Sequence, residues 1–80
     1  MRTVTLVTRQ GCHLCAQAAP LVAREAARAG ADYVERDVDE SAQDVRTYGQ
    51  KVPVVLLDGV EHAYWQVDPR ALRAALRTGR

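Results

Sequence analysis

The sequence of 80 residues contains no phenylalanine, and its aromatic side chains are limited to one tryptophan and three tyrosines. Since 48% of the residues are nevertheless hydrophobic, valine, leucine and alanine must form most of the core. A chain of this length can bury a single core. We therefore expect residues 1–80 to form one monomeric domain with an aliphatic interior.

The sequence also lacks an excess of one charge and a long hydrophobic run. Eleven basic and ten acidic residues leave a net charge of +1, which gives no broad field for binding nucleic acid or an anionic membrane. The longest apolar run, Val52 to Leu57, is far too short to span a bilayer, and the N-terminus does not have the pattern of a signal peptide. We expect no nucleic-acid or membrane partner, and a cytoplasmic location by default.

Cysteine occurs only twice, as Cys12 and Cys15, which are separated by His13 and Leu14. Two cysteines cannot form the disulfide framework of a small secreted domain. In a reducing compartment a close pair is more often catalytic or metal-binding than structural. The C-x-x-C segment is therefore the candidate functional site.

Hydrophobic periodicity and turn residues predict the element order β-α-β-α-β-β-α. The predicted strands are 3–8, 31–38, 53–57 and 60–65. The predicted helices are 12–29, a short helix that includes 45–48, and a helix that begins at 69. Asp58-Gly59 favours a type I′ hairpin between the last two strands.

The first predicted helix contains Pro20, which should remove one hydrogen bond and kink the axis, but in our interpretation does not end the helix. Gly30 ends it. An apolar stripe continues on both sides of the proline and consists of Leu14, Ala18, Leu21, Val22 and Ala26.

Capping residues mark the other two helices. Asp39 or Ser41 caps the short helix, and Gly49 closes it. Asp68 is expected to cap the last helix, with Pro69 at its first position, rather than to anchor a ligand. Gly79 is expected to end that helix.

A helix connects the first two strands, which should therefore be parallel, whereas the hairpin supplies an antiparallel pair. We expect an α/β fold with a four-stranded mixed sheet, helices on both faces, and the second strand near an edge. Cys12 would then follow the carboxyl end of the first strand, where open α/β sheets usually have their binding crevices.

The position of Cys12 at a helix start favours reactivity. Unpaired backbone N–H groups and the positive end of the helix dipole stabilise a thiolate there. In such motifs cysteine pKa values fall from about 8.5 into a range of roughly 3.5 to 7.5, so that one sulfur attacks disulfides near neutral pH. Cys15, one turn further on, can then displace a bound thiol by closing a bond with Cys12.

Three features of the sequence resemble the thioredoxin superfamily, and within it the small glutaredoxin-like proteins, over essentially the whole chain. A strand runs directly into the C-x-x-C motif at 7–15. Pro20 stands five residues after Cys15, where thioredoxins have a helix-kinking proline. Val52-Pro53 precedes the hairpin, where the superfamily has a cis-proline.

The resemblance implies roles for particular residues. Cys12 would be the nucleophile and Cys15 the resolving thiol. Pro53 would face them, and Val52 would offer backbone hydrogen bonds to a bound peptide or thiol. Arg9 stands where glutaredoxins often have a basic residue that helps to hold a glutathione carboxylate.

Other positions depart from the glutaredoxin pattern. Glutaredoxins usually have a Gly-Gly and then an Asp pair that hold the γ-glutamyl end of glutathione, whereas this chain has the segment Ala63 to Asp68. His13 and Leu14 replace the Pro-Tyr pair of the Cys-Pro-Tyr-Cys motif. A cationic His13 would stabilise the thiolate and make the disulfide a better oxidant.

For two side chains of the predicted hairpin, we prefer a structural interpretation to a functional one. We expect Trp65 in the core because its large apolar body favours burial, although at the end of the hairpin it could also line a substrate groove. We expect His62 to be a solvated strand residue.

We therefore expect a glutaredoxin-like thiol–disulfide oxidoreductase that reduces protein or low-molecular-weight disulfides by dithiol exchange through Cys12 and Cys15. Its substrates would be disulfide-bearing proteins or small thiols such as glutathione. A thiol or a flavin-linked reductase would recharge the pair, and no cofactor or metal is required.

Two other functions remain open. A redox-inert module would use the Val52-Pro53 groove to bind a peptide. A metal or iron–sulfur carrier would use Cys12. Zinc needs four ligands, however, and the chain has only two histidines, His13 and His62, besides the cysteines, so that a second chain would have to contribute.

Overall fold

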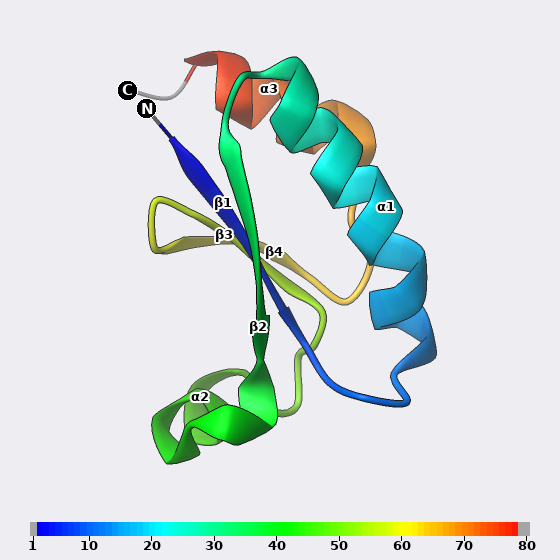
Figure 1. The fold of residues 1–80 in the computed structure, drawn as a ribbon, viewed down its shortest axis with the longest axis vertical. Helices are drawn as coiled ribbons and strands as arrows, with labels where there is room; N and C mark the ends of the chain where they lie inside the picture. Colours follow the sequence, from blue (N-terminus) through cyan, green and yellow to red (C-terminus); the bar gives the residue numbers. More distant parts are fainter. Residues whose placement is uncertain (1, 79–80) are drawn as a thin grey trace.

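The computed structural model describes residues 2–78, which form a four-stranded sheet and the helices packed on it (Figure 1). The elements are β1 (Thr3–Thr8), α1 (His13–Arg28), β2 (Asp32–Asp37), the 3₁₀ helix η1 (Val38–Glu40), α2 (Ala42–Tyr48), β3 (Val54–Leu57), β4 (Val60–Tyr64) and α3 (Pro69–Thr78). Apart from η1, this is the predicted order. None of the helices in the described part of the chain is both long and apolar enough to cross a bilayer.

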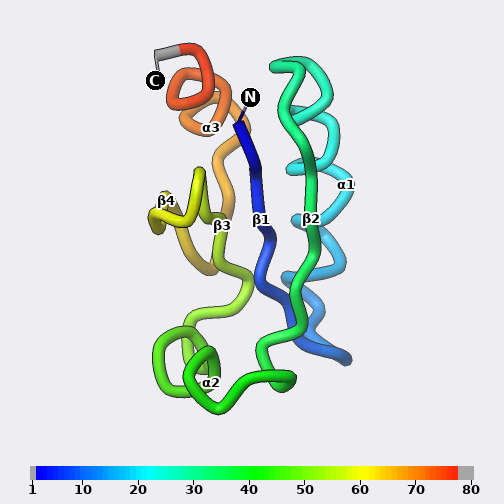
Figure 2. The backbone as a smooth tube through the Cα atoms, turned by 60° about the vertical axis from the view of Figure 1, so that its left-hand side comes forward, coloured from blue at the N-terminus to red at the C-terminus, as the bar shows by residue number. Residues whose placement is uncertain are grey.

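The strands lie in the order β2-β1-β3-β4, so that β2 and β4 are the edges (Figure 2). β1 is parallel to β2 and antiparallel to β3, and β4 is antiparallel to β3. Asp58 and Gly59 join β3 to β4 with φ angles of 51° and 85°. Because a type I′ turn requires two successive residues with positive φ, the predicted hairpin is confirmed.

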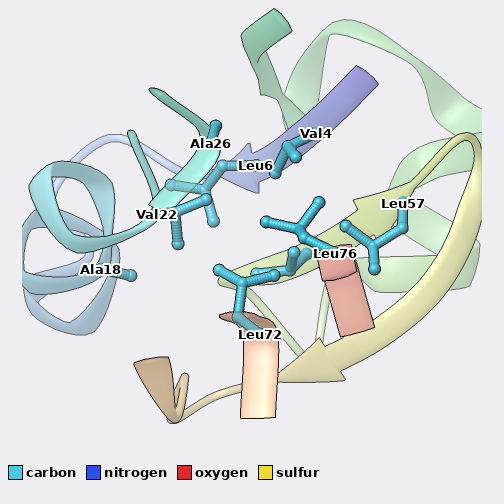
Figure 3. Packing of buried hydrophobic residues seen from close by; sticks show 9 residues of the cluster. Val4, Leu6, Ala18, Val22, Ala26, Leu57, Leu72 and Leu76 are labelled. Carbon is cyan, nitrogen blue, oxygen red and sulfur yellow. The ribbon is translucent and has the colours of Figure 1, made fainter. Parts of the chain in front are cut away.

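α1 and α3 lie together on one face of the sheet, and the main hydrophobic core is enclosed between them and the strands (Figures 1 and 3). All members of this core are aliphatic, as predicted. They are Val4, Leu6, Ala18, Val22, Ala26, Val55, Leu57, Leu72 and Leu76.

A smaller cluster lies on the opposite face of the sheet. It contains Val7, Val38, Val54 and Leu56, and Tyr48 of α2 packs against it. Helices therefore lie on both faces, as predicted. The cover from α2 is thin, because this helix has no fully buried residue.

The connection from β2 to α2 differs from the prediction. Val38, predicted as the end of the strand, begins η1, because the side chain of Asp37 accepts a hydrogen bond from the N–H of Asp39 and starts a helical turn. Ser41 is the cap of α2, since its hydroxyl accepts from the N–H of Asp44 at 3.2 Å. Of the two predicted caps, Ser41 is therefore correct and Asp39 is wrong.

The predicted helix 12–29 is confirmed with small corrections. α1 continues through Pro20 and is followed by Gly30 with a φ of 70°. Leu14, which we expected on the buried stripe, is 39% exposed. It belongs to the first turn of α1, which faces the segment after β4 across an open groove rather than the sheet.

The start of α3 is as predicted, because Oδ1 of Asp68 accepts from the N–H of Arg70 at 2.9 Å. This bond satisfies one of the free N–H groups at the helix start and gives Asp68 a capping role. The predicted end at Gly79 lies outside the described residues.

An ion pair between a buried glutamate and a half-exposed arginine joins α1 to α3. The side chain of Glu25 is 1% exposed, and Nε and Nη2 of Arg73 donate to its two oxygens at 2.9 and 2.8 Å. The hydrogen bonds from Arg73 lower the pKa of Glu25 although burial opposes this. The pair holds the two helices in register over the main core.

Replacing Arg73 with Met is expected to lower the Tm by about 5 °C at pH 7, because the carboxylate of Glu25 would lose the half-exposed guanidinium that pairs with it. Glu25 has a lowered pKa in the folded wild type, so its contribution to stability is complete above the ordinary value of 4.5 and is lost as the pH falls through the lower folded value. In the variant, protonation removes the unpaired charge, and the difference in Tm should shrink near pH 4.

Thermal unfolding followed by circular dichroism at both pH values measures this effect. Arg70→Met removes an exposed arginine from the same helix and is the matched control, expected to change the Tm by no more than a degree or two. An equal loss of Tm at pH 7 and pH 4 in Arg73→Met would show that packing, not the ion pair, is responsible.

Candidate active site

The cysteine pair lies where β1 passes into α1. Cys12 is the N-cap of α1, and its Sγ accepts a hydrogen bond from the N–H of Cys15 at 3.2 Å. The Cα atoms of the two residues are 5.2 Å apart, and the sulfurs form a disulfide. Cys12 is partly exposed, whereas Cys15 is only 4% exposed. An incoming disulfide therefore has access to Cys12 and not to Cys15.

A tight turn brings Cys12 to the start of the helix. Gly11 has a φ of 76°, and the N–H of Cys12 donates to the carbonyl of Arg9 at 3.2 Å. A Cβ at residue 11 would have open space around it. Glycine is thus favoured here by the left-handed backbone rather than by crowding.

Arg9 connects this turn to the segments around η1 and α2. Its Nε and Nη2 donate to the carboxylate of Asp39, both at 3.0 Å, and its Nη1 donates to the carbonyl of Gly49 at 3.0 Å. The hydrogen bond from Arg9 lowers the pKa of Asp39. The charge of Arg9 is therefore already balanced by a carboxylate, and a role in holding a substrate carboxylate stays a prediction.

Val52 and Pro53 lie at the same end of the sheet as the cysteine pair. Their peptide bond is cis, as the resemblance implied. Val54 pairs with Val7 near the end of β1, which places Pro53 beside the start of the turn that leads to Cys12. Pro53 is buried and Val52 is partly exposed.

Trp65 does not lie in the core, and the prediction of its burial is wrong. The residue is 53% exposed and has a φ of 65°, so that it leaves the geometry of β4. Its backbone N–H donates to the carbonyl of Pro53 at 2.9 Å, and its indole N–H donates to the carbonyl of Gln50 at 3.0 Å. These bonds hold the backbone of Trp65 next to Pro53 and its half-exposed indole against the carbonyl of Gln50.

Two hollows lie beside the first turns of α1, and the cysteines line one of them. One, of about 260 Å³, lies between the first turns of α1 and the segment after β4, and Leu14 and Trp65 belong to its lining. The other, of about 230 Å³, is lined by both cysteines together with Arg9 and Glu35 among others. The pair is thus open to solvent through the second hollow.

Glu35 was not singled out in the sequence analysis. It accepts a hydrogen bond from the hydroxyl of Tyr33 at 2.7 Å, and burial followed by this bond raises the pKa of Tyr33. Glu35 is followed by the charged residues Arg36 and Asp37 in a strand at the sheet edge, and nothing in that pattern distinguishes it from a solvated side chain. Only the parallel pairing of β2 with β1 brings it near the cysteines.

The two histidines lie apart from each other in the fold. His13 is exposed at the first position of α1, and His62 lies on β4, where it lines a hollow with Arg2 and Glu61. Within residues 2–78 no cluster of three or more histidine, cysteine, aspartate and glutamate side chains is arranged to hold a metal ion.

The comparisons with known proteins agree with this geometry. A family model described as "Glutaredoxin-like domain (DUF836)" matches residues 3–77. The chain belongs to the glutaredoxin-like family. Two relatives of this glutaredoxin-like chain are uncharacterized proteins from Mycobacterium bovis and Mycobacterium tuberculosis. Each is 42% identical over 76 residues, a match that covers 89% of this chain and 78% of the relative.

Solved structures show the same fold. Protein XcR50 from X. campestris is 31% identical, with a TM-score of 0.78 over 96% of this chain and 99% of that one. Thioredoxin from Fasciola hepatica shares the fold at 21% identity, with a TM-score of 0.72 over 99% of this chain and 81% of that one. The resemblance inferred from the C-x-x-C motif, Pro20 and Val52-Pro53 is thus confirmed for family and fold.

Proposed function

We propose that this glutaredoxin-like chain is a thiol–disulfide oxidoreductase that reduces protein or low-molecular-weight disulfides. The observation that supports this function best is the closed Cys12–Cys15 pair at the N-cap of α1, with one sulfur accessible and the other buried. The helix terminus favours the thiolate of Cys12 in the reduced state, and a thiolate is the reactive form of cysteine.

The reaction consists of two exchanges. The Cys12 thiolate attacks one sulfur of the substrate disulfide, forms a mixed disulfide, and releases the other substrate sulfur as a thiolate that takes up a proton. Cys15, once deprotonated, attacks Sγ of Cys12, forms the Cys12–Cys15 disulfide, and releases the second substrate thiol. Two electrons have then passed from the protein to the substrate.

An external reductant must return these two electrons. Two molecules of a small thiol, or one dithiol of a flavin-linked reductase, would reduce the Cys12–Cys15 bond by the same exchange chemistry. The cytoplasm is the compartment that we propose, because its thiol pool would keep the pair reduced. The exchange requires no metal or prosthetic group.

A redox titration tests this function. After equilibration in glutathione buffers of stepped ratio, we expect two free thiols per chain at the reducing limit and none at the oxidising limit, with a midpoint potential between about −270 and −180 mV. The reaction of Cys12 with iodoacetamide should show ionisation well below the pH at which a free cysteine ionises.

The same preparation distinguishes the alternatives. If Cys12 titrates as a free cysteine and no disulfide forms in any buffer, a redox-inert module that binds a peptide beside Val52-Pro53 is supported instead. If the protein purifies with zinc or iron, at less than one ion per chain when two chains share it, a carrier function is supported.

A further inference from the structure

Charge is distributed unevenly between the two main helices and the rest of the molecule. α1 and α3 together contain five arginines but only one of the ten acidic residues, Glu25. The net charge of +1 therefore conceals a separation of charge within the fold. We call the surface formed by the five side chains the arginine face. Its members are Arg24, Arg28, Arg70, Arg73 and Arg77.

The five arginines lie on two helices that pack side by side (Figure 1). Arg24 and Arg28 are about one turn apart in α1, and the arginines of α3 recur at intervals of three and four residues, so that each set lies on one side of its helix. The ion pair between Glu25 and Arg73 joins the two sets. All five arginines are exposed, and they therefore form one surface.

Most of the charges on the arginine face have no carboxylate partner within the described part of the chain. Elsewhere in residues 2–78, four basic side chains are each paired with a carboxylate at 2.9 to 3.2 Å. They are Arg2, Arg9, Arg36 and Lys51. On the arginine face, only Arg73 has such a partner among the described residues. The other four guanidinium groups present their donors to solvent, and such groups bind carboxylates and phosphates.

A hollow of about 270 Å³ lies within the arginine face, between the C-terminal halves of α1 and α3. It is lined by Glu25, Arg28, Ala29, Arg73, Leu76 and Arg77. Its exposed surface is mainly apolar, because arginine side chains lay their aliphatic stems along apolar surface and keep their charged ends in water. The hollow can therefore take up an apolar side chain, while the arginines at its rim bind negative groups on either side.

The arginine face is distant from the cysteine pair. Cys12 caps the start of α1, whereas Arg28 is the last residue of that helix. At a rise of 1.5 Å per residue, about 24 Å of helix separate the two. A partner held on the arginine face is therefore bound away from the reacting sulfurs, and its binding does not require disulfide exchange.

The composition of the two helices determines which anionic partner fits. Neither α1 nor α3 contains a phenylalanine, tyrosine or tryptophan that could stack on the bases of a single-stranded nucleic acid. In the described part of these helices, the one exposed large hydrophobic side chain is Leu14, at the far end of α1, so that none enters a bilayer beside the arginines. Phosphate groups also make no use of an apolar hollow, whereas an acidic polypeptide with an apolar residue uses both features.

We propose that the arginine face binds an acidic segment of a partner polypeptide. Its carboxylates pair with the four arginines that have no partner in the described chain, and one apolar side chain enters the hollow. Exposed ion pairs are individually weak, so that the affinity depends on several of them together and falls as salt screens them. This site is independent of the proposed oxidoreductase function.

Titration of the full chain with synthetic probes, followed by NMR, tests the proposal. The main probe is a short peptide with one leucine between two runs of glutamate. Its controls carry glutamine in place of glutamate, or serine in place of leucine, and a single-stranded DNA of equal charge is the fourth probe. We expect the main peptide to bind at least about tenfold more tightly than the glutamine peptide and the DNA, and about threefold more tightly than the serine peptide. Raising the salt from about 50 to about 300 mM should weaken its binding at least about fivefold.

Charge-reversal variants assign the binding to the arginine face. Arg28→Glu and Arg77→Glu should each raise the Kd of the main peptide at least about fivefold, because they place a like charge at the rim of the hollow. Arg28→Gln and Arg77→Gln are the second pair, since a glutamate at a helix C-terminus lowers stability. Arg46→Glu is the matched control. Arg46 is exposed on α2 and has no ion pair with any described residue, so that its reversal makes the same change in net charge and should alter the Kd by less than about twofold.

Each other outcome overturns a stated part of the proposal. DNA that binds as tightly as the main peptide would show that the face binds nucleic acid instead. Equal binding of the glutamine peptide, an equal loss in Arg46→Glu, or no binding of any probe would reject the acidic polypeptide as the partner of this face. Equal binding of the leucine and serine peptides would reject the role of the hollow. Disulfide reduction, measured separately on the same protein, is affected by none of these results.

Discussion

Replacing Cys12 with Ser is expected to abolish disulfide reduction, with a loss in rate of at least about 10³-fold. A serine hydroxyl stays protonated near neutral pH and cannot replace a thiolate as the attacking group. Cys15 cannot take over, because it is only 4% exposed. The measurement is the rate at which the full chain catalyses reduction of a disulfide-bonded protein by a dithiol, after subtraction of the uncatalysed rate.

The fold of the Cys12→Ser variant needs a matched reference. Its circular dichroism spectrum and Tm should equal those of the wild type in its reduced state, since both lack the disulfide. A variant that keeps more than about a tenth of the wild-type rate would contradict the role of Cys12 as nucleophile.

Replacing Cys15 with Ser is expected to stop the reaction after its first exchange. The sulfur of Cys15 is the group within bonding range of Sγ of Cys12, and a serine hydroxyl cannot displace the bound substrate thiol. One substrate molecule should therefore accumulate on Cys12, and turnover with a protein disulfide should fall by about 10²-fold or more. Mass spectrometry of the intact chain and of its peptides measures the mass increment and its position.

The Cys12→Ser variant is the control for this trapping experiment. It should form no adduct on Cys15 under the same conditions, because Cys15 is buried on the inner side of the first turn of α1. If Cys15 is labelled in Cys12→Ser as readily as Cys12 is labelled in Cys15→Ser, the two roles are reversed.

Local sequence patterns were sufficient for most of the fold. The alternation of polar and apolar residues at 3–8 predicted β1, and the Asp58-Gly59 pair predicted the hairpin. Both predictions succeeded because strand periodicity and turns with positive φ depend only on neighbouring residues. The stripe that continues beyond Pro20 predicted an unbroken α1. The C-x-x-C motif placed the cysteine pair at a helix start for the same local reason.

Distant contacts decide two features that local patterns did not predict: the buried Glu25, which the sequence analysis did not single out, and the exposure of Trp65. Position 25 lies between the stripe residues Val22 and Ala26, so helical periodicity alone places it on the buried face. Only the approach of α3 supplies Arg73 to make a buried glutamate stable there. Trp65 was assigned to the core by its size, but its positive φ and its hydrogen bonds to the segment before β3 leave the indole half exposed.

The sequence by itself determined the element order, the aliphatic core and the position of the two sulfurs at the start of α1, because caps, turns and periodicity act over a few neighbouring residues. The tertiary structure alone decided that Cys12 is accessible and Cys15 buried, that Arg9 binds Asp39, and that Trp65 and Leu14 face each other across a groove. These features depend on segments that are distant in the chain, and such contacts are fixed only when the sheet forms and brings the ends of β1, β3 and β4 together.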